Sequence, residues 1–324
     1  MGSQELVVHC EQVEAVVKRL SETEGELFGA KRDKSGRVSL SFDSLTAKSL
    51  KRVLDSGCHR ECFSLATVNM NPYVNTFHEV LKTHGTCFLK EAMSEESKVA
   101  HLNKVVDDIR LSVNTDLMRN INRRQEKAKK KRVESVSGYI EAMRSSYARV
   151  NCLRVDLGYR KGMFADSENL LEDLALVKSH WKKMREDLAR GEPVEGLIGF
   201  VVSLEYGLLS GYHFHAIFIY NGAYRQQDVS LAKILGDHWV QNVVPNGAGR
   251  YYNCNRFKDK YRRLGVGVIN HYENEKFEVL KSVVLGYMAK TDYVIDSISP
   301  SERAWFRGIT PKRNSQGKGR PRGK

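Results

Sequence analysis

The sequence predicts an α+β protein with an antiparallel sheet, and three observations carry this prediction. First, the second half of the chain alternates short runs of β-branched and aromatic residues with longer segments that repeat apolar residues at helical spacing. Second, two of the strand-like runs follow each other across a glycine-bounded loop, which is typical of a hairpin. Third, the first half gives mostly helical signals. We therefore expect a mostly helical accessory domain followed by a sheet domain.

The composition is that of a folded protein with a cationic surface. Of 324 residues, 41% are hydrophobic and 28% are charged, which excludes a disordered chain. Lysine and arginine number 52 against 39 acidic residues, a formal net charge of +13. An excess of this size favours a phosphate polyanion as partner. Because the chain exceeds the usual single-domain length, we expect more than one domain.

The protein is expected to be cytoplasmic, without a membrane partner. No apolar run reaches the roughly 18 residues of a membrane span. The first residues, MGSQELVVHCEQ, lack the basic-then-apolar order of a signal peptide. The cysteines show no repeated spacing, so reduced thiols are expected. Cys58, His59 and Cys62 resemble half of a zinc site, but no second ligand pair follows at finger-like spacing, which favours a structural role.

Residues 1–113 are predicted to form the accessory domain, to which the sequence assigns no role. Helices are expected at Ser44–Leu54 and after Ser94, where Ser94 and Ser97 are candidate N-caps. Residues 114–150 nearly lack glycine and proline and hold a basic cluster at Lys127–Arg132, so a long connecting helix is expected there. Its basic face is either a solvated spacer or a stripe that follows phosphates.

The elements of the second domain, residues 151–296, follow in a regular order. The order β-α-β-β-α-β-α is that of the split βαβ, or ferredoxin-like, arrangement with one extra helix. We expect an antiparallel sheet with helices on one face, which leaves the other face free to bind a ligand, as in RNA-binding (RRM-like) sheets. A flexible basic tail is expected at residues 297–324. The predicted strands are Cys152–Tyr159, Gly196–Tyr206, Gly211–Gly222 and Leu264–Tyr272, and the predicted helices are Asn169–Leu188, Ser230–Val244 and Glu275–Lys290.

Two histidines on one strand mark a candidate metal site. Alternation sends His213 and His215 to the same face of the strand. If the hairpin loop is Gly207–Gly211, Glu205 lies opposite His213, close enough for the three side chains to converge. Two imidazoles and a carboxylate leave coordination positions of a divalent metal open, which is typical of a catalytic metal. The alternative is that both histidines are partly buried and bonded to backbone or carboxylate groups.

A candidate nucleophile lies on the last predicted helix. Tyr287 and Lys290 are three residues apart and share a helical face. A tyrosine hydroxyl titrates at about pH 10, so a nearby cation such as Lys290 would favour the phenolate or neutralise charge in a transition state. On spacing alone, a core tyrosine beside a lysine whose ammonium reaches solvent accounts for the same pattern.

Together these motifs resemble the HUH endonucleases, named for a His-hydrophobe-His metal motif. HFH at 213–215, Glu205 upstream and YMAK at 287–290 stand in the order of that family. More narrowly, the chain resembles the replication initiation proteins of inoviruses, the filamentous phages, and of prophage-like elements. The matching segments are LRVDLGY, SLEYGLLSGYHFHAIF, YYNCNRFK, GVGVI, YMAKTD and RGITPKRNSQGKGRPR, within residues 150–324, about half of the chain.

The resemblance implies a site-specific nickase that starts rolling-circle replication of a phage, plasmid or prophage-like element. Tyr287 would attack a phosphodiester of single-stranded DNA, or of a hairpin, at a replication origin, leaving a 5′-phosphotyrosine and a free 3′-OH. The cofactor would be Mg²⁺ or Mn²⁺ at Glu205, His213 and His215, with no small-molecule cofactor, and religation would need no ATP. A host helicase and polymerase are further expected partners.

Arginines outside the metal site are further candidates for contacts with DNA. Arg154 shares a face of the first strand with Asp156, which indicates either a DNA contact or a surface ion pair. The last residues of the chain, 312–324, contain no acidic residue and include Arg313, Arg320 and Arg322. This stretch either binds phosphates non-specifically or only keeps the protein soluble.

Alternatives to this nickase remain open at the level of sequence. Some HUH initiators carry two tyrosines on one helical face, but Tyr293 follows Tyr287 by six residues and is off that face, which favours a single nucleophile. A non-catalytic nucleic-acid-binding module of ferredoxin-like fold would use the histidines only to contact bases. The remaining alternatives are a metal-dependent hydrolase of small phosphates and an HUH relaxase or transposase.

Overall fold

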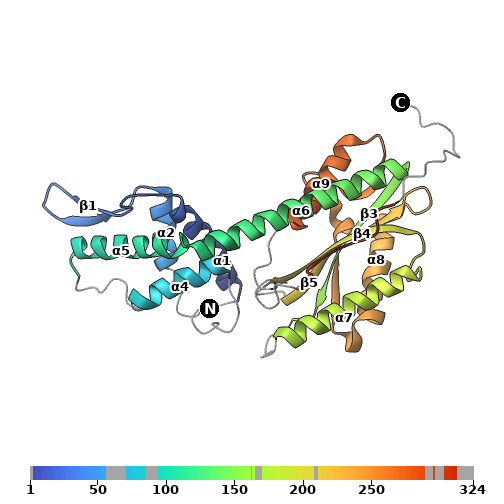
Figure 1. The fold of residues 1–324 in the computed structure, drawn as a ribbon, viewed down its shortest axis with the longest axis horizontal. Helices are drawn as coiled ribbons and strands as arrows, with labels where there is room; N and C mark the ends of the chain where they lie inside the picture. Colours follow the sequence, from blue (N-terminus) through green and yellow to red (C-terminus); the bar gives the residue numbers. More distant parts are fainter. Residues whose placement is uncertain are drawn as a thin grey trace. The chain divides into compact units, whose positions relative to one another are not determined.

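The structure, a computed structural model, describes residues 3–55, 71–84, 93–161, 163–164, 170–207, 211–288, 295 and 303–311. The chain divides into two compact units, Met1–Gln125 and Glu126–Lys324. Figure 1 shows that the first is mainly helical and that the second contains the large sheet. Among the described residues, no helix has the length and apolar character needed to cross a membrane.

The first unit is a helical bundle with a two-stranded sheet. Helix α5 starts at the predicted cap, since the Ser94 hydroxyl accepts a hydrogen bond from the Ser97 N–H. Side chains from its described helices, such as Val17, Leu50 and Phe77, share one buried core. The elements described in this unit are α1 (Ser3–Ser21), β1 (Gly29–Arg32), β2 (Val38–Ser41), α2 (Leu45–Asp55), α4 (Pro72–His84) and α5 (Glu95–Val113).

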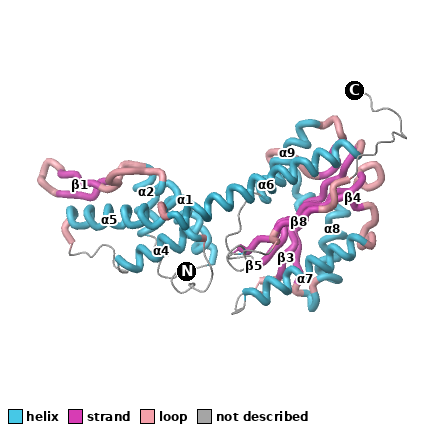
Figure 2. Tube along the Cα trace, in the orientation of Figure 1, coloured by secondary structure: helices cyan, strands magenta, loops and turns pink. Residues whose placement is uncertain are grey.

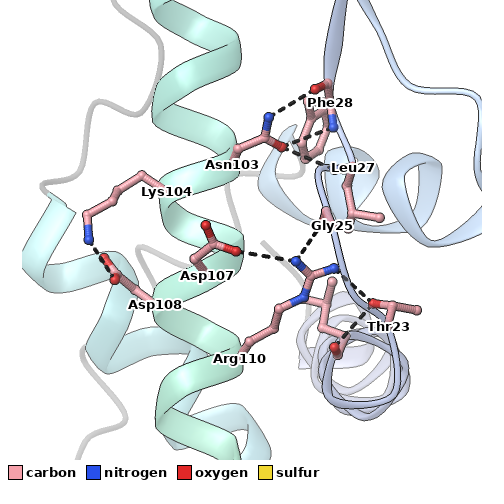
Figure 3. A network of polar contacts seen from close by, with 10 residues as sticks. Thr23, Gly25, Leu27, Phe28, Asn103, Lys104, Asp107, Asp108 and Arg110 are labelled. Carbon is pink, nitrogen blue, oxygen red and sulfur yellow. Dashed lines mark hydrogen bonds and ion pairs between the residues drawn. The ribbon is translucent and has the colours of Figure 1, made fainter.

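Polar side chains of α5 fix the loop that leads into β1 (Figure 3). Asn103 accepts hydrogen bonds from the backbone N–H groups of Leu27 (3.2 Å) and Phe28 (3.0 Å) and donates to Phe28 O (2.9 Å). Arg110 donates to Gly25 O at 2.7 Å. These contacts satisfy loop backbone groups that no sheet or helix satisfies, so α5 holds the loop in place.

Helix α6 (Asp116–Ser146) is the long helix expected between the two domains. Its lysines 127 and 129–131 are exposed, whereas Val136, Tyr139, Ile140 and Met143 are buried in the second unit. The helix is therefore polar over its basic cluster and packs against the sheet over its last turns.

The second unit contains a six-stranded antiparallel sheet, which confirms the predicted α+β class. The order along the sheet is β6-β3-β5-β4-β8, and β7 pairs with the first residues of β3, on the edge that β6 also occupies. Its strands are β3 (Arg149–Tyr159), β4 (Leu197–Gly207), β5 (Gly211–Asn221), β6 (Gly249–Asn253), β7 (Gly267–Asn270) and β8 (Trp305–Arg307).

One face of this sheet carries the larger core, under α7 (Leu170–Ala189) and α8 (Asp228–His238). A π-helical turn, Trp239–Val243, continues α8. The ring of Phe214 on β5 packs between Trp181 and Trp239, with centroid distances of 5.7 and 5.6 Å. Figure 2 shows α7 and α8 beside the strands they cover.

The opposite face is not free over its whole area, which corrects the expectation that helices cover one face only. The last turns of α6 and the helix α9 (Asn274–Met288) cover the apolar part of this face, including Cys152, Val201, Ile217 and Ile219. These side chains would otherwise expose apolar surface to water. The rest of the face, around His213 and His215, is polar and lies outside this apolar cluster.

Two short strands of the second unit were not predicted, nor were β1 and β2 of the first, and one predicted strand is shorter than expected. β6 has the sequence GRYYN, which is poor in β-branched residues, and it is a strand because β3 supplies its hydrogen-bond partners. β8 pairs with β4 inside the segment expected to be a flexible tail, so residues 305–307 belong to the sheet. The predicted strand Leu264–Tyr272 is limited to β7.

Candidate metal centre

The hairpin of β4 and β5 has the register that the sequence predicted. Glu205 pairs with His213, and Gly207 pairs with Gly211, so the described strands approach the turn without a slip. Gly211 has a φ of 63°, a conformation that favours glycine. A slip of one residue would have turned Glu205 to the other face.

Glu205, His213 and His215 form a group that could hold a metal ion, with ligand atoms within 4.8 Å of one another. Glu205 Oε2 lies 3.5 Å from His215 Nε2 and 3.9 Å from His213 Nε2. The two imidazole rings are nearly perpendicular, with centroids 4.9 Å apart. Two ring nitrogens and one carboxylate oxygen therefore face a common point.

Both imidazoles are oriented through their other nitrogen. His213 Nδ1 lies 3.0 Å from Gly211 O, and His215 Nδ1 lies 2.8 Å from Asp156 Oδ1. Because a carbonyl and a carboxylate oxygen only accept, each ring donates its Nδ1–H and turns Nε2 toward Glu205. Metal-binding histidines are held in this way, by a hydrogen bond from the nitrogen that does not bind the metal.

Asp156 is a site residue that sequence reasoning missed. The sequence placed it on one face with Arg154 but gave no sign of its partner on β5. The pairing of β3 with β5 brings Asp156 opposite His215, although 59 residues separate them. Only the strand order reveals this contact, since spacing within one strand cannot.

The carboxylates of Asp156 and Glu205 favour a positive charge within the group. Burial disfavours the imidazolium of His215, but hydrogen bonds to Asp156 and Glu205 outweigh this effect and raise its pKa to about 9. Burial lowers the pKa of His213, and the charge on His215 lowers it further. Within the described residues, Glu205 Oε1 is buried without a hydrogen-bond partner. An acceptor in that position is expected to have a ligand, and a divalent cation would supply one.

Arg154 is buried rather than presented to a ligand. Its side chain is only 8% exposed, and its Nη2 lies 3.6 Å from Asp156 Oδ2. Of the two alternatives for Arg154, the ion pair is present, although inside the protein and not on its surface. Burial opposes ionisation of Asp156. The hydrogen bond from His215 and the charge of Arg154 act in the other direction, and the pKa of Asp156 is lowered overall.

A cavity of about 450 Å³ opens beside the histidines. Its walls come from β3, β5 and β6, and include Asp156, His213, His215 and Arg250. Gly158 lies between His213 and Arg250, and a Cβ there would be 3.6 Å from His213 Cβ and 3.8 Å from Arg250 Cγ. The missing side chain thus leaves room for a ligand between His213 and Arg250.

The other predicted site residues lie partly or wholly outside the described residues. The backbone of Tyr287 belongs to α9, but its side chain is not described, and Lys290 and Tyr293 are not described at all. The same holds for the tail arginines Arg313, Arg320 and Arg322, and for Cys58, His59 and Cys62.

No known protein family, no curated protein and no solved structure matches this chain. The family resemblance therefore stands on its sequence motifs, and the candidate metal centre stands on the geometry given above.

Proposed function

We propose that the second unit is a metal-dependent endonuclease that nicks single-stranded DNA and starts rolling-circle replication of a phage, plasmid or prophage-like element. The observation that carries the proposal is the convergence of Glu205, His213 and His215 on the polar part of a sheet face. Mg²⁺ or Mn²⁺ bound there would polarise a phosphate and orient it for in-line attack.

The strand order supports the ferredoxin-like arrangement that this proposal requires. The four predicted strands take the order β7-β3-β5-β4, with β5 in the interior of the sheet. The two histidines lie on that interior strand and Glu205 on its hairpin partner. A rigid central strand is a suitable support for a site that must hold its geometry during a reaction.

In the proposed reaction, the hydroxyl of Tyr287 attacks the phosphorus of a phosphodiester. A phosphotyrosine bond forms, the bond from phosphorus to the 3′ oxygen breaks, and the tyrosine proton is lost while the 3′ oxygen gains one. The product is a 5′-phosphotyrosine and a free 3′-OH, and the reverse reaction rejoins the strand without ATP. Lys290 would stabilise the negative charge that develops during the attack.

The charge of the protein supports a polymeric substrate. The formal net charge is +13, and lysines 127 and 129–131 are exposed on α6. A small phosphate needs few cations, whereas a nucleic acid backbone is bound through many. These observations favour DNA over a small phosphate ester.

The test is a search for a covalent adduct. The full-length protein is incubated with Mn²⁺ and labelled single-stranded DNA, both circular phage DNA and a random oligonucleotide pool, and analysed on a denaturing gel. We expect a labelled protein band that Tyr287→Phe abolishes. The matched control is Tyr272→Phe, because Tyr272 is an exposed tyrosine that lies just before α9.

Each alternative has its own outcome in this assay. An adduct that survives Tyr287→Phe overturns the assignment of the nucleophile. Binding of DNA without any adduct, with Mg²⁺ or with Mn²⁺, favours the non-catalytic module. Phosphate hydrolysis that needs His213 and His215 but not Tyr287 identifies a hydrolase. A relaxase or transposase would form the same adduct, and the identity of the DNA strand that is cut would separate these from a replication initiator.

A further inference from the structure

Strand β6 and the turn after it place two aromatic rings side by side on the polar face. Tyr252 lies on β6, and Phe257 lies in the 3₁₀-helical segment η3 (Cys254–Lys260). Their rings are stacked, with centroids 5.3 Å apart and an angle of 11° between the planes. Tyr252 is 48% exposed, so much of its ring is open to solvent.

The aromatic pair lies in the same row of the sheet as the metal centre. On β3, Asp156 pairs with His215 on one side and with Tyr252 on the other. In a sheet, residues of one cross-strand row point to the same face, and two strand spacings amount to roughly 10 Å. Tyr252 also lines the cavity beside His213 and His215. A ligand in that cavity can therefore touch both the imidazoles and Tyr252.

Cations surround the pair. A second cavity, of about 460 Å³, lies against Tyr252 and Phe257, and its lining includes Lys233 and Arg256 but no acidic residue. The ammonium of Lys260 is 4.9 Å from the centre of the Phe257 ring, and the guanidinium carbon of Arg256 is 5.9 Å from it. Aromatic rings with flanking cations are the elements with which proteins bind single-stranded nucleic acids.

The turn that carries Phe257 is fixed before any ligand binds. Asn255 is fully buried; its side chain accepts from the Arg154 N–H (2.8 Å) and donates to Cys152 O (3.1 Å) and to Asp228 Oδ2 (2.9 Å). Lys258 binds the same carboxylate at 2.9 Å. The segment is thus tied to β3 and to α8, and a base that stacks on it meets a preorganised surface.

The neighbouring residue holds β6 from the opposite face. The ring of Tyr251 packs on Gly236 of α8, where a Cβ would come within 2.2 Å of it, and its hydroxyl donates to Asp237 at 2.9 Å. With Tyr251 fixed against the helix, alternation along the strand directs Tyr252 to the polar face.

We infer that Tyr252 and Phe257 form a stacking platform for an unpaired base of the single strand. Tyr252 supplies the exposed ring and Phe257 supports it, while Arg250, Arg256 and Lys260 contact the backbone phosphates. The inference rests on the proposed function to the extent that the stacked base belongs to the strand whose phosphate lies at Glu205, His213 and His215.

The test measures binding without catalysis. Affinity of the full-length protein for a fluorescent oligo(dT) is measured by anisotropy in EDTA. We expect Tyr252→Ala to weaken binding by roughly tenfold or more, and Tyr252→Phe to bind like the wild type, because the ring provides the stacking. The matched control is Tyr224→Ala. Tyr224 is 81% exposed and lies just after the last residue of β5, whereas His213 and His215 lie near the start of that strand. Binding by Tyr252→Ala equal to that of the wild type overturns the platform.

A second measurement separates stacking from charge and from loss of structure. On an abasic oligonucleotide of the same length, wild type and Tyr252→Ala should bind equally, because phosphates are present and bases are not. A variant that is weaker on both oligonucleotides by the same factor overturns the stacking interpretation. Neither assay needs a metal or Tyr287, so a protein that fails to nick can still show the platform. A protein that nicks but shows no effect of Tyr252→Ala loses only the platform.

Discussion

At the scale of single residues, Asp156 is the strongest candidate for tuning the candidate metal centre from outside it. Its carboxylate accepts the Nδ1–H of His215 at 2.8 Å and is not one of the three residues that could hold a metal. We expect Asp156→Asn to lower Mn²⁺ affinity by roughly 10- to 100-fold, because an amide accepts more weakly and carries no charge. Isothermal titration calorimetry measures this affinity. The control is Asp259→Asn, the same change at an exposed aspartate. Equal affinity in both variants would show that Asp156 does not orient His215.

The sequence predicted the histidines and Glu205 but not Asp156, and the reason is physical. A hairpin is local, so its register follows from a loop bounded by Gly207 and Gly211. The contact between Asp156 and His215 depends on which strand lies beside β5, and that choice is made by packing across the whole sheet. The burial of Arg154 escaped prediction for the same reason, since η3, which is bonded to the Arg154 N–H through Asn255, lies about a hundred residues further along the chain.

At the scale of elements, the contact between α6 and β4 depends on one glycine. A Cβ on Gly199 would lie 2.2 Å from Tyr139 Oη and 2.4 Å from Met143 Cε. We expect Gly199→Ala to lower the free energy of unfolding by about 1–3 kcal/mol, because the helix must move away from the strand. Gly138→Ala is the control, since a Cβ at this helix position meets nothing within 4 Å. It should be neutral or stabilise by up to about 1 kcal/mol. Urea denaturation followed by circular dichroism compares the two.

A buried hydrogen bond between His238 and Asp187 joins α7 to the end of α8 and gives stability a pH dependence. Asp187 Oδ2 lies 2.8 Å from His238 Nε2. Burial opposes ionisation of Asp187, but the hydrogen bond from His238 and the charge of Lys183 outweigh it, so its pKa is lowered. A carboxyl with a lowered pKa stabilises the fold above its unfolded pKa of about 4, and this contribution disappears as pH falls through the folded pKa. We expect Asp187→Asn to reduce the loss of stability between neutral and acidic pH, as measured by urea denaturation. An unchanged pH profile would contradict this.

The helical period predicted α7 and α9 closely but could not say what their faces pack against. The same limit applies to α6, whose basic cluster was visible whereas its buried turns over the sheet were not. β6 and β8 were missed because short polar or aromatic strands form only where an existing edge supplies their hydrogen bonds. Periodicity thus predicts elements that bury their own face, and it misses those that depend on a partner.

At the scale of the whole molecule, the excess positive charge is either a general property of the surface or, under the proposed function, a local contact with DNA. Lysines 127 and 129–131 are exposed on α6 and are the densest cationic group that the sequence predicted. If each contacts a phosphate, changing all four to glutamine should reduce the slope of the logarithm of the DNA-binding constant against the logarithm of the salt concentration by about 3 for single strands.

The control variant changes four exposed lysines of the first unit to glutamine (Lys31, Lys34, Lys48 and Lys104), which removes the same net charge. Because these lysines are scattered, we expect them to alter the slope by less than about 1. Anisotropy titrations over a range of NaCl concentrations, in EDTA, measure both slopes. Equal small changes in the two variants would make α6 a solvated spacer, whereas a larger change for α6 alone locates the DNA backbone along it.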